Sequence, residues 1–169
     1  GSGFLSTSSV QWESASHKFS EAGVRLVILR IGIVLSLQGG ALPALKKTLP
    51  LGIAPVLGSG KQYYAWIHID DVCGFIMHVL SPQPVSGTFN LCAGVSTQKE
   101  LMQAIQKIYG RFSVLMPAPA FVLRLMLGEM ADTVLISQRV NNNKLLQSGY
   151  QLKYSNITAA LEHLRSTSV

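Results

Sequence analysis

Charged residues are scarce in this chain. Of its 169 residues, 13% are charged and 48% are hydrophobic, whereas an average soluble domain carries about 25% charged residues. Uninterrupted apolar runs are also missing, because the two most apolar stretches, residues 24–37 and 117–127, contain Arg25, Arg30 and Arg124. A membrane-spanning helix needs about 20 apolar residues with few charges, so no membrane partner is predicted. Apolar surface without polar cover instead indicates a contact with further protein, or with a second copy in a homo-oligomer.

Basic clusters and cysteine motifs are absent too. The net charge is +6, but Lys46 and Lys47 are the only adjacent basic pair, and no basic stripe alternates with aromatic residues, so no nucleic-acid partner is predicted. Cys73 and Cys92 have no CxxC spacing; two free thiols in a cytoplasmic protein are favoured over a disulfide. No signal peptide opens the chain. Residues 1–3, Gly-Ser-Gly, resemble a cloning remnant, and the natural protein is expected to start upstream.

Two cofactor motifs are absent. No GxGxxG follows a predicted strand, and Gly60-Lys61 lacks the earlier glycine of a P-loop. The chain therefore has no evident means of holding a dinucleotide pyrophosphate by itself. No tyrosine is followed four residues later by a lysine, since Tyr150 and Lys153 are only three apart. No catalytic residue is predicted.

Hydrolase and metal motifs are absent as well. Ser59, His68 and Asp70 lie near one another in the sequence, but no GxSxG motif surrounds the serine. The histidines fall on separate predicted elements, and no pair of them has the spacing of a zinc site with a third ligand. No metal site is predicted among the four: His17, His68, His78 and His163.

Hydrophobic periodicity predicts alternating helices and strands, which indicates an α/β architecture with a parallel sheet. Strands are predicted at residues 24–33, 64–69, 87–91 and 113–115, and a loop with short strand pieces at 50–60. Helices are predicted at residues 9–22, 41–49, 70–80, 97–109, 119–128, 144–148 and 156–164. In the first helix, Trp12 and Phe19 lie on the face expected to be buried, and Gly23 ends the helix. Thr97 and Glu100 form a predicted capping box.

The segment 66–71, WIHIDD, resembles the F/Y-I-H-V-x-D segment of extended short-chain dehydrogenases, and further segments point to one subfamily. They occur in the order seen in an atypical NAD-dependent epimerase/dehydratase subfamily that is often labelled a SulA-like cell-division inhibitor. Its members also share the carboxy-terminal segments, although they tend to have a proline where this chain has Asn141-Asn142-Asn143. The matching segments are WE (12–13), LRIGIVLS (29–36), GGAL (39–42), GSGKQ (58–62), GTFNL (87–91), LGE (127–129), SQRV (137–140), KLL (144–146) and GY (149–150).

The resemblance implies a fold and a function. It implies that residues 4–169 form the C-terminal part of a Rossmann-like extended short-chain dehydrogenase fold, with late parallel strands and a small, mostly helical substrate-binding lobe. The dinucleotide-binding segment and the Tyr/Lys pair would lie in the missing part of the parent, which would use NAD or NADP on a small-molecule substrate. This chain would then be a substrate-side fragment of an epimerase or reductase, inactive alone. The alternative is a non-catalytic binding or regulatory module on an epimerase scaffold.

Two cofactor-side residues follow from the resemblance. Ligands of such folds sit outside the carboxyl ends of the strands, which places Arg30 and Gly32 near the nicotinamide side of the cleft. Arg30 can equally serve in a structural ion pair or bind a carbonyl. Gly32 can permit the close approach of a ligand, or only of another backbone segment.

Five substrate-side residues also follow: Lys61, Gln62, Tyr64, Trp66 and His68. For Trp66, a packing role and a role in stacking on a substrate are equally compatible with the sequence. For His68, a hydrogen-bonded structural role is favoured over a catalytic one. Nucleotide-sugar epimerases usually carry an arginine at the position of Tyr64 to bind diphosphate. Lys61 offers only a flexible point charge in its place, so a nucleotide-sugar substrate is not favoured.

Asp70 and Asp71 follow the predicted strand directly. An aspartate at this junction can accept hydrogen bonds from the free N–H groups of the first helical turn. The two are therefore interpreted as helix-capping and structural residues. They are not interpreted as an acid/base pair, because sequence neighbours do not face one another on a helix.

Overall fold

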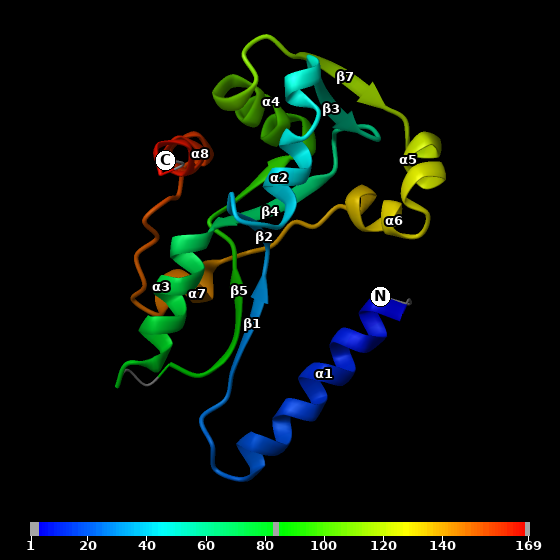
Figure 1. Ribbon diagram of the computed structural model, residues 1–169. Coiled ribbons are helices and arrows are strands. Elements are labelled where there is room, and N and C mark those ends of the chain that lie inside the picture. Colours follow the sequence, from blue (N-terminus) through cyan, green and yellow to red (C-terminus); the bar gives the residue numbers. More distant parts are fainter. Residues whose placement is uncertain (1–3, 83–84, 168–169) are drawn as a thin grey trace.

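The computed structural model describes residues 4–82 and 85–167, in an α/β arrangement (Figure 1). Residues 1–3, the cloning remnant expected from the sequence, lie outside this part. The strands are β1 (Val27–Ile31), β2 (Ile33–Leu35), β3 (Ile53–Leu57), β4 (Tyr63–His68), β5 (Gly87–Leu91), β6 (Gly94–Thr97) and β7 (Val114–Ala118). The helices are α1 (Phe4–Glu21), α2 (Ala41–Lys46), the 3-10 helix η1 (Leu49–Leu51), α3 (Ile69–Leu80), α4 (Gln98–Tyr109), α5 (Ala120–Leu127), α6 (Met130–Leu135), α7 (Asn143–Gln147) and α8 (Ile157–Ser166).

The predicted parallel pairing is present, in three small sheets. β1 pairs in parallel with β5, and β3 pairs in parallel with β7. The third sheet has the order β2-β4-β6, in which β4 is parallel to β2 and antiparallel to β6. In the sequence β2 follows β1, and β6 follows β5. β1 and β5 pair with each other, but β2 and β6 do not, because β4 lies between them. The branch point is Gly32, whose N–H donates to the Leu91 carbonyl at 3.0 Å.

The core lies around this branch, where helices cover the strands. The 12-residue α3 follows β4 directly and buries Phe75 (0% exposed) on the sheet side. α4 packs against β3 and α8, with Leu101, Ile105 and Leu161 fully buried. Burial of one such large apolar side chain stabilises the fold by about 1.5–3 kcal/mol. The capping box predicted for α4 is confirmed, since Thr97 and Glu100 hydrogen-bond each other's backbone N–H groups.

The structure revises several predicted boundaries. The single strand expected at 24–33 is two strands, because Gly32 stands where the chain leaves the pairing with β5. β3 lies in the stretch 50–60, where a loop with short strand pieces was expected, whereas β6 and α6 were not predicted at all. These two elements span four and six residues, which is too short for periodicity to be seen.

α1 is helical as predicted, but its predicted buried face is exposed. Gly23 ends the helix as expected: its N–H donates to Ser20, and the N–H of Val24 donates to Phe19, a Schellman pattern. Trp12 is nevertheless 80% exposed and Phe19 60%. Figure 1 shows why, because α1 lies apart from the other helices and is joined to them through β1. The expectation that this face packs on a core was wrong for the described residues.

The cap of α3 also differs from the prediction. The N-cap is His68, whose Nδ1 accepts the backbone N–H of Asp70 at 3.0 Å. Asp70 therefore does not cap the helix. Asp71 is fully buried and structural, as interpreted: its carboxylate accepts the Tyr150 hydroxyl at 3.2 Å and the backbone N–H groups of Lys153 and Tyr154 at 2.7 and 3.1 Å.

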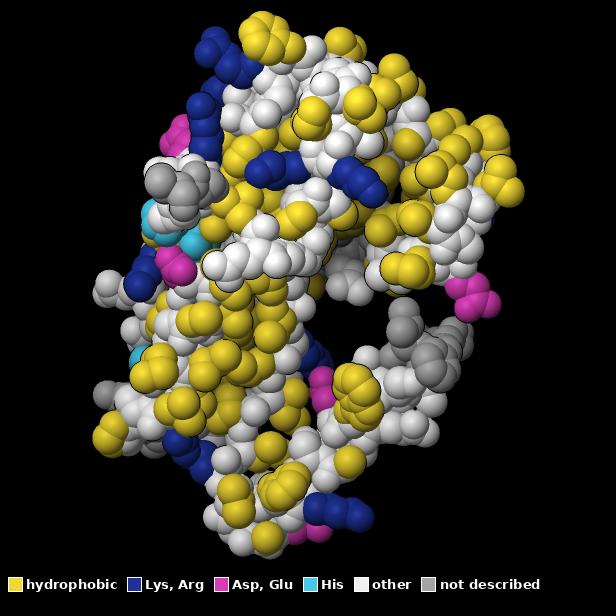
Figure 2. All heavy atoms as spheres, viewed as in Figure 1, with side chains coloured by type: hydrophobic (Ala, Val, Ile, Leu, Met, Phe, Trp, Pro, Cys, Tyr) yellow, Lys and Arg dark blue, Asp and Glu magenta, His cyan; other side chains and the backbone are white. Residues whose placement is uncertain are grey.

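No helix in the described part of the chain combines the length and apolarity needed to cross a membrane. Several exposed apolar residues lie on two short helices. Figure 2 shows them over α5 and α6, beside an open hollow that separates this pair from α1. Phe121, Leu125, Met126 and Met130 are each more than 70% exposed there.

Replacing Asp71 by asparagine tests the anchor of the carboxy-terminal segment. Asp71→Asn keeps the shape of the side chain but directs its NH2 group toward groups that themselves donate hydrogen bonds. We therefore expect the free energy of unfolding to fall by about 2–4 kcal/mol. Urea denaturation measures this change. Asp132→Asn, at a side chain that is 74% exposed, is the control and is expected to shift stability by less than about 0.5 kcal/mol. Equal midpoints for both variants would contradict the anchoring role.

Candidate functional site

The candidate site is the carboxyl end of the β1–β5 pair, because ligands of open α/β sheets bind at this edge. Arg30 lies there with its side chain 58% exposed. Its Nε and Nη2 donate to the two oxygens of Glu13 on α1 at 2.7 and 2.6 Å. This bidentate hydrogen bond from Arg30 lowers the pKa of Glu13. Arg30 thus forms the structural ion pair that was one of its two interpretations, and this pair links β1 to α1.

Gly32 follows Arg30 at the branch of the sheet. A Cβ at this position would lie 2.7 Å from the carbonyl oxygen of Ala65 and 3.4 Å from that of Leu91. The absence of a side chain at Gly32 therefore allows a neighbouring backbone segment of this chain to approach closely. This was the second of its two sequence interpretations.

A segment that we term the crossing segment, residues 137–142, runs over this edge between α6 and α7. Tyr63 binds one end of it, since its N–H donates to the Ser137 hydroxyl and its carbonyl accepts the Gln138 N–H. At the other end the Asn142 side chain donates to the Cys92 carbonyl at 2.8 Å, and Asn90 donates to the Asn141 carbonyl at 3.1 Å.

Arg139 is the charged residue that sequence reasoning did not assign. Its guanidinium carbon lies 4.2 Å from the ring centroid of Tyr63, and the residue is exposed. The sequence did contain a signal, since SQRV (137–140) is one of the segments shared with the epimerase subfamily. Nothing in the sequence showed that this segment lies beside Cys92 and Asn90, about 50 residues earlier.

The substrate-side candidates divide into buried and exposed residues. Gln62 and Tyr64 are buried and come together, because both side chains donate to the Val134 carbonyl. Burial raises the pKa of the Tyr64 hydroxyl. Trp66 is 3% exposed and lies against Gly94, which agrees with the packing interpretation. Lys61 is exposed.

His68 lies apart from the other candidates, at the carboxyl end of β4 and 0% exposed. Its Nε2 is 3.2 Å from Nδ1 of His163, on α8. In the part of the chain that the structure describes, His68, Asp70 and His163 form a group whose possible metal-ligand atoms all lie within 4.8 Å of one another. The hydrogen bond from Asp70 N–H occupies the lone pair of His68 Nδ1, so Nε2 carries the ring proton and has no lone pair for a metal. The geometry therefore does not favour a metal here.

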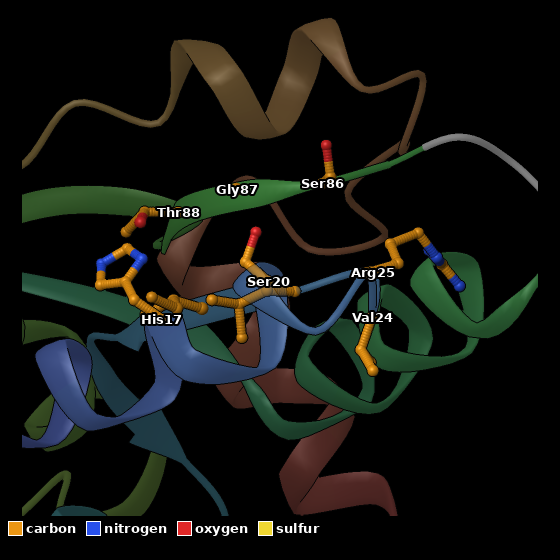
Figure 3. Close-up of a pocket in the computed structure, with 10 residues that line it drawn as sticks. His17, Ser20, Val24, Arg25, Ser86, Gly87 and Thr88 are labelled. Carbon is orange, nitrogen blue, oxygen red and sulfur yellow. The ribbon is translucent and has the colours of Figure 1, made fainter.

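A groove of about 580 Å³ lies at the opposite end of the same two strands. Figure 3 shows His17 and Ser20 of α1 on one side and residues of β5 on the other. Arg25 is not available to a ligand, because its Nη1 donates to the carbonyls of Val79 and Val85 at 2.7 and 3.0 Å. The groove surrounds the amino ends of β1 and β5, which is the wrong edge for a cofactor in this class of sheet.

The fold defines the class: a Rossmann-like extended short-chain dehydrogenase architecture with parallel strand pairs. It resembles the crystal structure of a human epimerase family protein with NADPH, with a TM-score of 0.79 and 32% identity over 85% of this chain and 49% of that one. A nucleoside-diphosphate sugar epimerase from Corynebacterium glutamicum superposes with a TM-score of 0.74 and 25% identity, over 96% of this chain and 31% of that one.

Sequence comparison narrows the class. An epimerase family protein of Staphylococcus aureus is 40% identical over 168 residues, which is 96% of this chain and 54% of that protein. The family described as "Domain of unknown function (DUF1731)" matches residues 118–164. The chain thus spans about half the length of the curated relatives it matches. These likenesses match it to a C-terminal portion of the epimerase family.

A single methyl group tests the branch of the sheet. Gly32→Ala would place a Cβ against the Ala65 backbone, which cannot move as a side chain could, so we expect a loss of about 1–3 kcal/mol in the free energy of unfolding. Gly39→Ala is the matched control, since nothing lies within 4 Å of its added Cβ. Chemical denaturation compares the two, and a Gly32→Ala protein as stable as the control would disprove the close approach.

Proposed function

We propose that residues 4–169 form the substrate-side part of an NAD(P)-dependent epimerase or reductase, and that this part is inactive alone. The main support is the carboxyl edge of the β1–β5 pair, where Arg30 carries an exposed side chain and Asn90 binds the crossing segment. Related structures were solved with NADPH, and with NAD for a UDP-glucose 4-epimerase of Thermus thermophilus. The chain has no glycine-rich turn of its own for a pyrophosphate.

Proton transfer in this enzyme would depend on a tyrosine outside this chain. A catalytic tyrosine needs a pKa closer to neutrality than its usual value of about 10. Here burial and the neighbouring Asp71 carboxylate hold the pKa of Tyr150 well above that value. Burial also raises the pKa of Tyr64 and Tyr109. These hydroxyls are suited to structural hydrogen bonds rather than to acid/base work.

The cofactor-side role falls to Arg30 and Gly32. Arg30 follows the central part of β1 and carries an exposed guanidinium, whose position Glu13 fixes. Gly32 lets β4 approach the end of β1, so that backbone atoms of β4 lie at the carboxyl edge of the β1–β5 pair. Both residues would stand beside the nicotinamide half of NAD or NADP.

On the substrate side, Lys61 is the exposed residue among the five candidates, and this exposure supports a direct contact with a small molecule. Gln62, Tyr64 and Trp66 would support this wall from behind. Tyr64 stands where nucleotide-sugar epimerases carry a diphosphate-binding arginine, and its hydroxyl is engaged by the Val134 carbonyl. A substrate without a diphosphate fits this wall better.

A non-catalytic binding or regulatory module on the same scaffold is the second candidate. It is favoured by the apolar surface of α5 and α6, which suits a protein contact, a homo-oligomer included. Cys73 and Cys92 are both free thiols, which fits a reducing, cytoplasmic environment for either candidate.

Cofactor binding tests the proposal. The isolated chain is expected to show no saturable NADPH binding by fluorescence, whereas a fusion of the preceding half of the Staphylococcus aureus relative to residues 4–169 is expected to bind. Within the fusion, Arg30→Gln should weaken NADPH binding about tenfold, equivalent to about 1.4 kcal/mol. Arg111→Gln, an exposed arginine in the turn after α4, is the control and should leave the Kd unchanged.

Two results would contradict this function. One is an isolated chain that binds NADPH as tightly as the fusion. The other is a folded fusion, verified by circular dichroism, that binds neither NADPH nor NADH, which would favour the non-catalytic module.

A further inference from the structure

Two histidines from distant parts of the chain meet between β4 and α8. The Nε2 of His68 lies 3.2 Å from Nδ1 of His163, although 95 residues separate them. The ring of Tyr154 covers both, with centroids 4.1 Å from His68 and 4.7 Å from His163. Figure 1 places α8 and the start of α3 on the side of the molecule away from α1. The pair therefore lies outside the candidate site.

The tautomers of this pair follow from one backbone contact. The Asp70 N–H donates to His68 Nδ1 at 3.0 Å, so the ring proton of His68 is on Nε2. His68 Nε2–H must then donate to Nδ1 of His163, which accepts only while that nitrogen is unprotonated. The two hydrogen bonds together require both rings to be neutral, because Nδ1 of His68 accepts from Asp70 and Nδ1 of His163 accepts from His68.

The surroundings prevent His68 from adapting to a proton on its partner. Its side chain is 1% exposed, the Asp70 amide holds Nδ1, and Tyr154 stacks on its face. A proton on Nδ1 of His163 would place two N–H groups face to face, and His163, with 34% of its side chain exposed, is the ring that can turn away.

We propose that the His68–His163 pair is an acid-sensitive clasp that joins α8 to the junction of β4 and α3. At neutral pH the hydrogen bond holds the Tyr154 segment between the two elements. A proton on Nδ1 of His163 removes the acceptor of this bond, and the ring can then turn toward the Asp70 carboxylate, whose Oδ2 lies 4.0 Å from Nδ1. α8 remains attached to α4, because Tyr109 and Arg165 bond across that contact. Only its contact with the β4–α3 junction opens.

The charged groups around the pair set the direction of the pH effect. Burial lowers the pKa of His68, and His163 and Lys153 lower it further, whereas the carboxylates of Asp70 and Asp71 oppose this. A folded-state pKa below the unfolded value of about 6.5 means that the unfolded chain takes up the proton first. The stabilisation contributed by neutral His68 is therefore complete above about pH 6.5 and is lost as the pH falls through its lower folded-state pKa.

Thermal unfolding of the whole chain from about pH 8 to about pH 5.5 tests the clasp. His163→Gln supplies an amide oxygen that accepts from His68 Nε2–H at every pH. Over this range the Tm of the unmodified chain should fall by about 2–4 °C more than that of His163→Gln. His17→Gln, which removes a histidine on α1, is the matched control and should keep the full pH dependence.

Three results would overturn the clasp. His163→Gln could show the same pH dependence as the unmodified chain. Long-range 1H–15N spectra of the histidines could show the ring proton of His68 on Nδ1. Zinc ions at about pH 7.5 could raise the Tm in a manner that His163→Gln abolishes, which would make the pair a metal site instead.

Discussion

The structure depends on the close approach of three backbone segments at Gly32. β1 and β5 run side by side up to this residue, and then β4 enters between their continuations. The Ala65 carbonyl oxygen lies 2.7 Å from the position that a Cβ of Gly32 would take, and the Ala93 N–H donates to the Trp66 carbonyl across the same opening at 2.7 Å. A Cβ at this position would require the backbone of β4 to shift.

The carboxyl edge of the β1–β5 pair follows from that branch. Because the strands separate there, the ends of β1 and β5 are not covered by a continuous sheet, and the crossing segment closes them through Asn142 and Asn90. The same separation gives Arg30 an exposed place, with Glu13 of α1 as its partner.

The junction of β4 and α3 holds the carboxy-terminal segment against the rest of the structure. β4 leads into α3, and Asp71 in its first turn anchors the segment before α8 through three hydrogen bonds. His68 and His163 add a contact between their rings to the same junction. Histidine, aspartate and tyrosine therefore have structural duties here, although each of these residue types also occurs in catalytic sites.

The sequence determined the elements with strong local signals: the branched-apolar run of β1, the capping box of α4, the glycine end of α1 and the motif around β4. Those signals are local, and backbone propensities act over a few residues. The sequence also placed Arg30 and Gly32 at a strand end and read Asp71 as structural.

Only the tertiary structure decided which faces are buried and which distant residues meet. The helical face with Trp12 and Phe19 looked like core but is exposed, because amphipathic spacing specifies a face and not its partner. The pairing of His68 with His163, of Asp71 with Lys153 and Tyr154, and of Asn142 with Cys92 joins residues 50 to 95 positions apart. Such contacts arise from the packing of whole elements, which no local pattern encodes.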